Sequence, residues 1–357
     1  MRALLAVAVL GTILLASAGS ASPGAAKPRT LATAGPVLGI AADGDRAALD
    51  IGLPGHCSRV LVWEPLRRPR VVTLLHRGRC EGIRKDIHAP ALAGTRAAWY
   101  WRTGGNGLET IVLTATLAHP TPVRIAAGYY GDMEASGGEF VHPPIGDGAL
   151  LAFTYEQRCG LDSRQFSCPP GRKSGDVLHA SVWRVGGHGP CPGMTLAGRP
   201  FRSCSRLAQA DGELSVLALD AGRIAVRTAS GVRLLSGTGG VLGDFPVRAR
   251  AAALSGNRLA LRTAQAVEIY DTDSGRLAAR FPAERSLRLQ DLDRAILVTA
   301  LGRMVTLRRL GWGQTSTIRA TGIARAQLER AGLFVASGRR VTFTPIGDVL
   351  QRLGARR

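Results

Sequence analysis

The chain has 357 residues, of which 45% are apolar, and a formal net charge of +20 at pH 7. Its apolar content and its 45 glycines, which recur in regularly placed turns, exclude a disordered chain. The length fits one large repeat domain or two ordinary domains and does not decide between them.

The first 21 residues have the pattern of an export signal. Met1 and Arg2 precede an uncharged apolar run over residues 3–16, and Ala16-Ser17-Ala18 offers a cleavage site. Retention as a membrane anchor is the alternative, although the run is shorter than the ~20 residues that a span needs. We therefore expect a signal peptide at 1–21, a flexible leader at 22–35 and one domain over 36–357.

Export makes the six cysteines readable as disulfides, because oxidising compartments preserve them. Zinc is the competing interpretation, but the sequence has no C-x-x-C and no H-x-x-x-H spacing. Locality favours three pairs, each closing a short loop: Cys57 with Cys80, Cys159 with Cys168, and Cys191 with Cys204.

The positive charge is carried almost wholly by arginine, since Lys27, Lys85 and Lys173 are the only lysines. One interpretation is a surface for acidic polymers, such as teichoic-type chains of a cell envelope. The alternative is the codon usage of a GC-rich genome, which favours arginine, alanine and glycine. The arginines are evenly spread without interleaved aromatic residues, so we expect no specific nucleic-acid site.

A turn followed by a short apolar strand recurs seven times along the chain. A period of about 35–50 residues built from short strands predicts the blades of a propeller. Helical solenoids are excluded because nothing before residue 323 sustains a helical apolar period over three turns. We predict an all-β, seven-bladed β-propeller with four antiparallel strands per blade, or six blades if one copy is spurious. The copies lie at residues 44–51, 94–101, 147–154, 221–228, 256–263, 292–299 and 331–338.

The clearest blade predicts strands at 247–254, 259–263, 267–271 and 276–281, with Gly275 in a left-handed hairpin position. Residues 269–281, IYDTDSGRLAARF, resemble a strand-turn-strand of secreted bacterial propellers of the quinoprotein-like, WD40-like and YVTN-like groups. The resemblance implies the fold alone, because the diagnostic boxes of these groups are absent. For closure, the sequence suggests a fourth strand at 349–353, and residues 30–36 could add an outer strand beside it.

The third blade exceeds the period by two long loops, 156–176 and 186–202. Long loops on a rigid scaffold commonly carry binding sites. In a propeller, the loop between strands two and three of a blade shares a face with the connection between blades. The loop 156–176 should therefore lie beside the connection 128–140.

That connection concentrates aromatic and acidic residues in a chain poor in both. The functional interpretation is a ligand mouth, with His142 and Tyr155 nearby; the alternative is an ordinary polar loop whose tyrosines pack on the scaffold. Asp132, Glu134 or Glu156 could also supply the facing carboxylates of a glycosidase. The candidate binding residues are Tyr129, Tyr130, Asp132, Glu134, Glu139 and Glu156.

These patterns favour a secreted or envelope-located, monomeric, non-catalytic scaffold that binds a protein or glycan, with an acidic envelope polymer as another possible partner. We expect no metal, no cofactor and no transmembrane segment after processing. The alternatives are a polysaccharide hydrolase or lyase, and a structural envelope protein held by its positive charge. No nucleophile or phosphate-binding motif is present.

Overall fold

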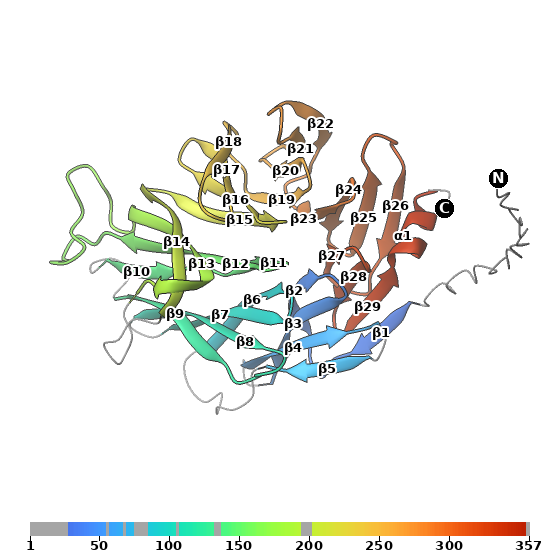
Figure 1. Ribbon diagram of the computed structural model, residues 1–357, viewed down its shortest axis with the longest axis horizontal. Helices are drawn as coiled ribbons and strands as arrows, with labels where there is room; N and C mark the ends of the chain where they lie inside the picture. Colours follow the sequence, from blue (N-terminus) through green and yellow to red (C-terminus); the bar gives the residue numbers. More distant parts are fainter. Residues whose placement is uncertain are drawn as a thin grey trace, which may run out of the picture.

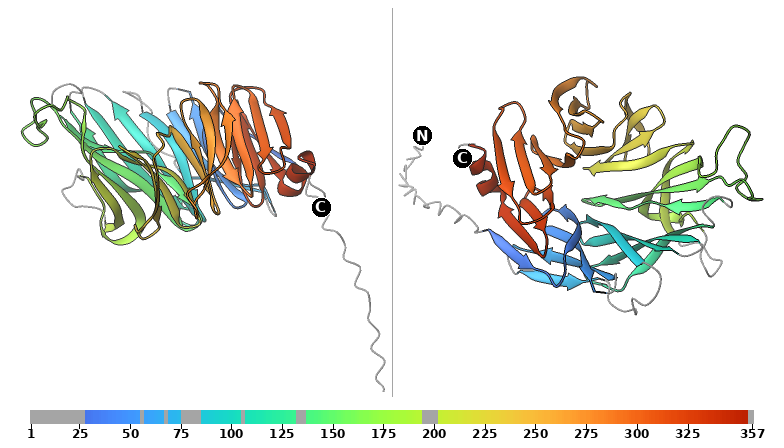
Figure 2. Two further views of the ribbon diagram at one scale, coloured as in Figure 1. Left: turned by 90° about the horizontal axis from the view of Figure 1, so that it is seen from above. Right: turned by 180° about the vertical axis from the view of Figure 1, so that it is seen from behind.

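The protein is built from short antiparallel strands arranged around a common axis (Figure 1). The computed structural model describes residues 28–54, 57–66, 69–74, 85–104, 107–131, 137–193 and 202–354. Within these ranges the chain forms strands β1 to β29 and one helix, so the all-β prediction is confirmed. The view from behind in Figure 2 shows the sheets following one another around the ring.

Four of the sheets each contain four strands that pair in chain order. The third of these sheets reproduces the four strands predicted for the clearest blade, although β19 starts four residues later than expected. Their strands are β2 (Val37–Asp43), β3 (Arg46–Leu53), β4 (Cys57–Glu64) and β5 (Arg70–Thr73); β15 (Leu214–Asp220), β16 (Arg223–Thr228), β17 (Gly231–Ser236) and β18 (Val241–Phe245); β19 (Ala251–Ser255), β20 (Arg258–Arg262), β21 (Ala266–Asp271) and β22 (Leu277–Pro282); and β23 (Arg288–Asp293), β24 (Ile296–Leu301), β25 (Met304–Arg309) and β26 (Thr315–Arg319).

A fifth, larger sheet contains nine strands. Strands β10 and β11 both pair with β12, and Pro143 and Pro144 lie between them. Proline has no N–H for the ladder, so the two prolines divide what is otherwise one strand. The nine strands are β6 (Lys85–Ala93), β7 (Arg96–Gly104), β8 (Leu108–Thr116), β9 (Val123–Tyr130), β10 (Gly138–Val141), β11 (Ile145–Asp147), β12 (Leu150–Arg158), β13 (Val177–Pro190) and β14 (Arg202–Asp211).

The sixth sheet joins the two ends of the described chain. It consists of β27 (Ala324–Leu328), β28 (Gly332–Ser337), β29 (Arg340–Pro345) and, on its outer edge, β1 (Arg29–Ala32). Strand β1 pairs with β29 in antiparallel register, for example Leu31 with Val341. Part of the expected leader is therefore a strand, and the outer strand suggested at 30–36 is corrected to residues 29–32, with β29 as its partner in place of the strand expected at 349–353.

The predicted strand at 349–353 is wrong, because these residues belong to helix α1 (Ile346–Arg352) and its C-terminal cap. Ile346, Val349, Leu350 and Leu353 follow a helical spacing of three and four residues. Val349 and Leu353 are buried in the core between the last two sheets. About two helical turns of apolar periodicity are too short to separate a helix from a strand by pattern alone.

The second strand of each sheet is sealed between neighbouring sheets, as its apolar sequence predicts. Strand β28 is buried along its whole length, and Leu49 of β3 is fully buried. Leu49 and Phe334 belong to one core cluster that joins the first sheet to the last. The outermost strands β22 and β26 alternate between exposed and partly buried residues, as expected for a rim.

The hairpin turn predicted at Gly275 is present in the structure. The hairpin between β21 and β22 is closed by a hydrogen bond from the Gly275 N–H to the carbonyl of Asp271. Gly275 has φ +69°, a left-handed conformation that glycine adopts without a steric penalty. Strands β2, β6, β11, β15, β19, β23 and β27 follow one another around the axis, and the arrangement is a β-propeller (Figure 1).

Candidate functional site

The predicted site residues separate into exposed, buried and undescribed groups. Tyr129 is 60% exposed, whereas Tyr130 is buried and its ring packs on Phe140, with centroids 5.6 Å apart. Because adjacent residues of a strand point to opposite faces, the two tyrosines cannot form one stacking surface. Tyr129 therefore offers an exposed ring, whereas Tyr130 packs on the scaffold, as the alternative interpretation has it.

The four acidic candidate residues differ in burial and in hydrogen bonding, and two of them lie outside the described residues. Glu139 accepts a hydrogen bond from the hydroxyl of Tyr155. Burial, and then this hydrogen bond, raise the pKa of Tyr155. Glu156 is only 3% exposed. Asp132 and Glu134 lie outside the described residues, and so does Cys80, the expected partner of Cys57. The two other expected cysteine pairs form disulfides, Cys159–Cys168 and Cys191–Cys204.

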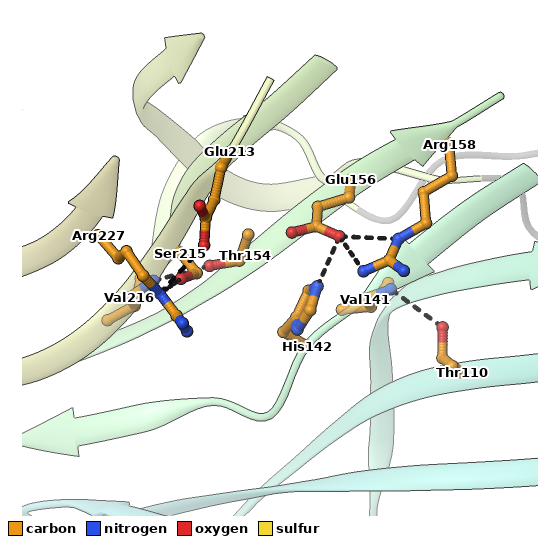
Figure 3. A network of polar contacts seen from close by, with 10 residues as sticks. All are labelled: Thr110, Val141, His142, Thr154, Glu156, Arg158, Glu213, Ser215, Val216 and Arg227. Carbon is orange, nitrogen blue, oxygen red and sulfur yellow. Dashed lines mark hydrogen bonds and ion pairs between the residues drawn. The ribbon is translucent and has the colours of Figure 1, made fainter. Parts of the chain in front are cut away.

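Glu156 is the centre of a polar network on one face of β12 (Figure 3). Its Oε2 accepts hydrogen bonds from Nε and Nη2 of Arg158 at 3.1 and 2.7 Å. Nε2 of His142 lies 2.9 Å from the same oxygen. Residues two apart on a strand share a face, which places Glu156 beside Arg158. Phe140 of β10 pairs with Glu156, and this pairing brings His142, two residues after Phe140, alongside β12.

Burial opposes ionisation of Glu156, but the hydrogen bonds from its two neighbours, His142 and Arg158, outweigh this effect. The hydrogen bond from His142 and those from Arg158 together hold the pKa of the Glu156 carboxyl below its usual value. The guanidinium of Arg158 also lies over the ring of Phe140, 4.9 Å from its centroid. Glu156 is therefore an ionised, fixed acceptor at physiological pH.

The neighbouring sheet supplies the opposite wall (Figure 3). Thr154 on β12 accepts a hydrogen bond from the backbone N–H of Val216 on β15 at 2.9 Å, which joins the two sheets. On β16, Nε of Arg227 lies 3.2 Å from the hydroxyl of Ser215 and 3.3 Å from Glu213. This pair is partly exposed, unlike the carboxylate of Glu156.

The long loop between β12 and β13 forms the third wall of the site. The disulfide Cys159–Cys168 ties its first half, and the N–H of Gly175 donates to the carbonyl of Cys159 at 2.8 Å. Asp176 accepts a hydrogen bond from the backbone N–H of Lys173 at 2.9 Å. The loop and the two walls enclose a polar cavity of about 490 Å³, which we call the inter-blade cavity; it is lined by His142, Glu156, Arg158, Arg172, Gly175, Asp176, Val177, Gly212, Glu213, Ser215 and Arg227.

The arginines that line the inter-blade cavity differ in whether they form ion pairs. Arg158 and Arg227 are paired with acids, whereas the exposed side chain of Arg172 has no ion pair with any described residue. Across the described part of the chain, no group of three or more His, Cys, Asp or Glu residues is placed to hold a metal ion. The cavity therefore offers a cationic side chain and several fixed hydrogen-bonding groups.

Sequence reasoning found Glu156 and His142 but missed the arginines around them. Arg158 could have been noticed as the residue two positions after Glu156 on the same strand. Arg227 could have been noticed because the fourth and fifth copies of the repeat both end in Arg-Thr, at Arg227 and Arg262. Arg172 lies in a loop without periodicity, so no pattern marks it.

Comparison with known proteins gives a likeness in fold alone. No protein family matches the chain, and no curated protein matches it in sequence. A chain in a crystal structure of the mitotic checkpoint complex is 12% identical with a TM-score of 0.50, over 95% of this chain and 99% of the other. The Saccharomyces cerevisiae protein Sqt1 is also 12% identical, with a TM-score of 0.43 over 88% of this chain and 98% of its own.

The fold is a WD40-like β-propeller. At this level of identity the likeness does not extend to partners or chemistry. None of the residues that the structure describes forms a helix long and apolar enough to cross a membrane.

Proposed function

We propose that this WD40-like propeller is a non-catalytic scaffold that binds another protein through the inter-blade cavity. The observation that carries the proposal is the cavity itself: about 490 Å³ of polar space, walled by two rigid sheets and by a disulfide-tied loop. Arg172 supplies a cation without an ion-pair partner among the described residues. An acidic side chain of a partner segment would accept a charge-assisted hydrogen bond from Arg172.

The chemistry of Glu156 favours binding over catalysis. A glycosidase needs one carboxyl that is protonated near neutral pH, and its pKa must therefore be raised. The pKa of Glu156 is lowered instead, and its oxygen is occupied by Arg158 and His142. Glu156 is suited to hold the cavity in shape.

The setting of the scaffold is part of the same proposal. Two disulfides are compatible with an exported protein, since such bonds persist in oxidising compartments. We count the nine-stranded sheet as two blades, β6–β9 and β10–β14, because one aligned residue pair, Tyr130 with Gly138, links β9 to β10. With the other sheets this count gives seven blades, the last completed by β1.

A matched pair of arginine variants tests the proposal. Arg172 and Arg164 are both exposed residues of the same disulfide-tied loop, but only Arg172 lines the cavity. Tagged wild-type protein should capture a partner from extracellular material of its source, and Arg172→Glu should weaken that capture roughly 10-fold or more. Arg164→Glu should leave it unchanged. Equal capture by both variants would place the partner elsewhere.

A glycan partner is a second candidate, favoured by Tyr129. Its ring is 60% exposed on an otherwise folded strand, and an exposed aromatic ring can stack on a sugar. Tyr129→Ala should abolish retention on the glycan and leave Arg172-dependent protein capture intact. Retention that is indifferent to Tyr129 excludes this second site.

A further inference from the structure

A second cavity lies on the propeller axis, apart from the inter-blade cavity. It has a volume of about 520 Å³, within the range of small-molecule sites. Its walls come from five strands that are consecutive around the ring: β23, β27, β2, β6 and β11. The apolar part includes Leu38, Ile40, Pro90 and Pro144, and the polar part consists of Arg288, Gln290, Arg325 and Gln327.

The polar residues come from a duplicated sequence. Strand β23 begins Arg288-Leu289-Gln290, and β27 has Arg325-Ala326-Gln327 at the equivalent place, 37 residues later. Because first strands of a propeller run side by side in the same direction, the equivalent positions of adjacent blades are neighbours. The repeat thus places two arginines and two glutamines together at the mouth where these strands begin.

The glutamines fix this arrangement across the two blades. The side-chain oxygen of Gln290 accepts a hydrogen bond from the backbone N–H of Ala326 at 3.0 Å. The side-chain nitrogen of Gln327 donates to the backbone carbonyl of Gln290 at 3.1 Å. The strands that carry the arginines are therefore held in one register by side chains of the same motif.

Each arginine is anchored to the backbone by one nitrogen. Nη2 of Arg288 donates to the carbonyl of Ala324 at 2.6 Å, directly before Arg325 in the chain. Nη1 of Arg325 donates to the carbonyl of Val37 at 3.2 Å. No carboxylate among the described residues forms an ion pair with either guanidinium. A guanidinium has five N–H donors, so both groups keep donors for a ligand.

The electrostatics favour an anion at this mouth. Burial, and then the charge of Arg288, lower the pKa of Arg325, while the carboxylate of Asp50 acts in the opposite direction. The far end of the axis is acidic, since a smaller cavity of about 190 Å³ there is lined by Asp147, Asp220, Asp291 and Asp293. Glu329 also lines it, but its raised pKa of about 9 keeps this carboxyl protonated at neutral pH. An anion would therefore be held at the arginines and repelled by the other end.

We propose that the axial cavity binds an organic anion, with a carboxylate or phosphate group on Arg288 and Arg325 and a small apolar body against Leu38, Ile40 and Pro90. Two adjacent guanidinium groups match the oxygens of such a head group, and the anion relieves the repulsion between them. The same head group could belong to a free small molecule or to the C-terminal carboxylate of a peptide.

Calorimetric titration at low salt tests the site with defined probes. The probes are hexanoate, hexyl phosphate, hexylammonium, and a short apolar peptide with either a free or an amidated C-terminus. The variants are Arg288→Gln, Arg325→Gln and their Lys counterparts, with Arg319→Gln as control. Arg319 is an exposed arginine on β26, in the same sheet as Arg288.

At least one of the hexyl anions or the free-acid peptide should bind the wild type, and hexylammonium should not. Each Gln variant should weaken that binding roughly 10- to 100-fold, because a charge-assisted hydrogen bond is lost. The Lys variants keep the charge, so their affinity for the anion should lie between those of the wild type and the Gln variants. Arg319→Gln should bind the anion like the wild type. Preference for the free-acid peptide over the hexyl anions identifies a chain terminus as the source.

Two results would overturn the proposal. One is no binding of any anionic probe at millimolar concentration to folded wild-type protein. The other is binding that survives in the Gln and Lys variants as well as in Arg319→Gln. Folding of each variant is checked by thermal unfolding, and Arg325→Gln should unfold no earlier than the wild type because it removes repulsion with Arg288.

Discussion

The side-chain carboxylate of Glu329, just after β27, accepts a hydrogen bond from the backbone N–H of Gly44 at 3.0 Å. This bond joins the last blade to the first, across 285 positions of sequence. The same relationship recurs around the ring, with an acid at the end of one first strand accepting from the turn of the next blade. The other pairs are Asp43 with Gly94, Asp147 with Ala221, and Asp220 with Gly256.

Glu329→Gln should stabilise the protein at alkaline pH. Burial, followed by the negative charge of Asp291, raises the pKa of Glu329 to about 9. Because this pKa lies above the unfolded value, the wild type loses stability as pH rises from about 4.5 to about 9. Glutamine keeps an acceptor for Gly44 and has no proton to lose. The advantage of the variant should be near zero at pH 4.5 and grow up to pH 9 in urea unfolding.

The exposed Glu284 provides the control for this experiment. Glu284→Gln removes the same charge from the surface and should show no comparable pH dependence. A Glu329→Gln effect that is constant between pH 4.5 and 9 would contradict the assignment of a raised pKa.

Closure of the ring by β1 should be measurable with two neighbouring substitutions. Leu31 is partly buried and packs against the core between the first and last sheets, whereas Thr30 is exposed on the other face of β1. Leu31→Asp should destabilise the protein by about 1–2 kcal/mol, somewhat less than the roughly 1.5–3 kcal/mol of a fully buried leucine because Leu31 is only partly buried. Thr30→Asp should have little effect. Similar urea midpoints for the two variants would argue against a packed β1.

Glu156→Gln should destabilise the protein at neutral pH by on the order of 2 kcal/mol, because Arg158 loses a charge-assisted acceptor. The folded pKa of Glu156 is lowered, so its contribution is present above about pH 4.3 and is lost as pH falls through the folded pKa. The difference from the wild type should therefore narrow in acid. Glu213→Gln, at the exposed pair with Arg227, should change stability by less than about 1 kcal/mol.

The disulfide Cys191–Cys204 should contribute about 3 kcal/mol, given a sequence separation of 13 residues. Both cysteines are also buried in the core of the larger sheet. Replacing both by alanine should therefore lower the free energy of unfolding at least as much as replacing Cys159 and Cys168. A smaller loss of unfolding free energy at Cys191 and Cys204 would contradict a stabilising role for this disulfide.

Much of the fold was predictable because each blade repeats the same local signals. In six of the seven copies a glycine turn precedes a continuous apolar strand, as at Gly256 before Leu259. The seven copies correspond to β3, β7, β12, β16, β20, β24 and β28. Burial on both faces demands such runs, so periodicity reports it directly. Ring closure was less visible because β1 has four residues and its partner lies about 310 residues away.

The candidate site was only partly predictable. His142 and Glu156 were both expected near the connection 128–140 because these loops share one face of a propeller. The orientation of Tyr130 depended on a register that the sequence does not specify. Arg172, Arg288 and Arg325 were missed because the arginines are numerous and evenly spread, so composition cannot distinguish a ligand-facing arginine from a solvated one. Their roles emerge only when the blades are brought together.

Hydrogen–deuterium exchange on the complex with a captured partner tests the central claim most directly. Binding at the inter-blade cavity predicts slower exchange in residues 170–177 and 212–216, and this protection should disappear with Arg172→Glu. Protection confined to the turns at the opposite ends of the first strands, such as 221–222 and 256–257, would contradict the account.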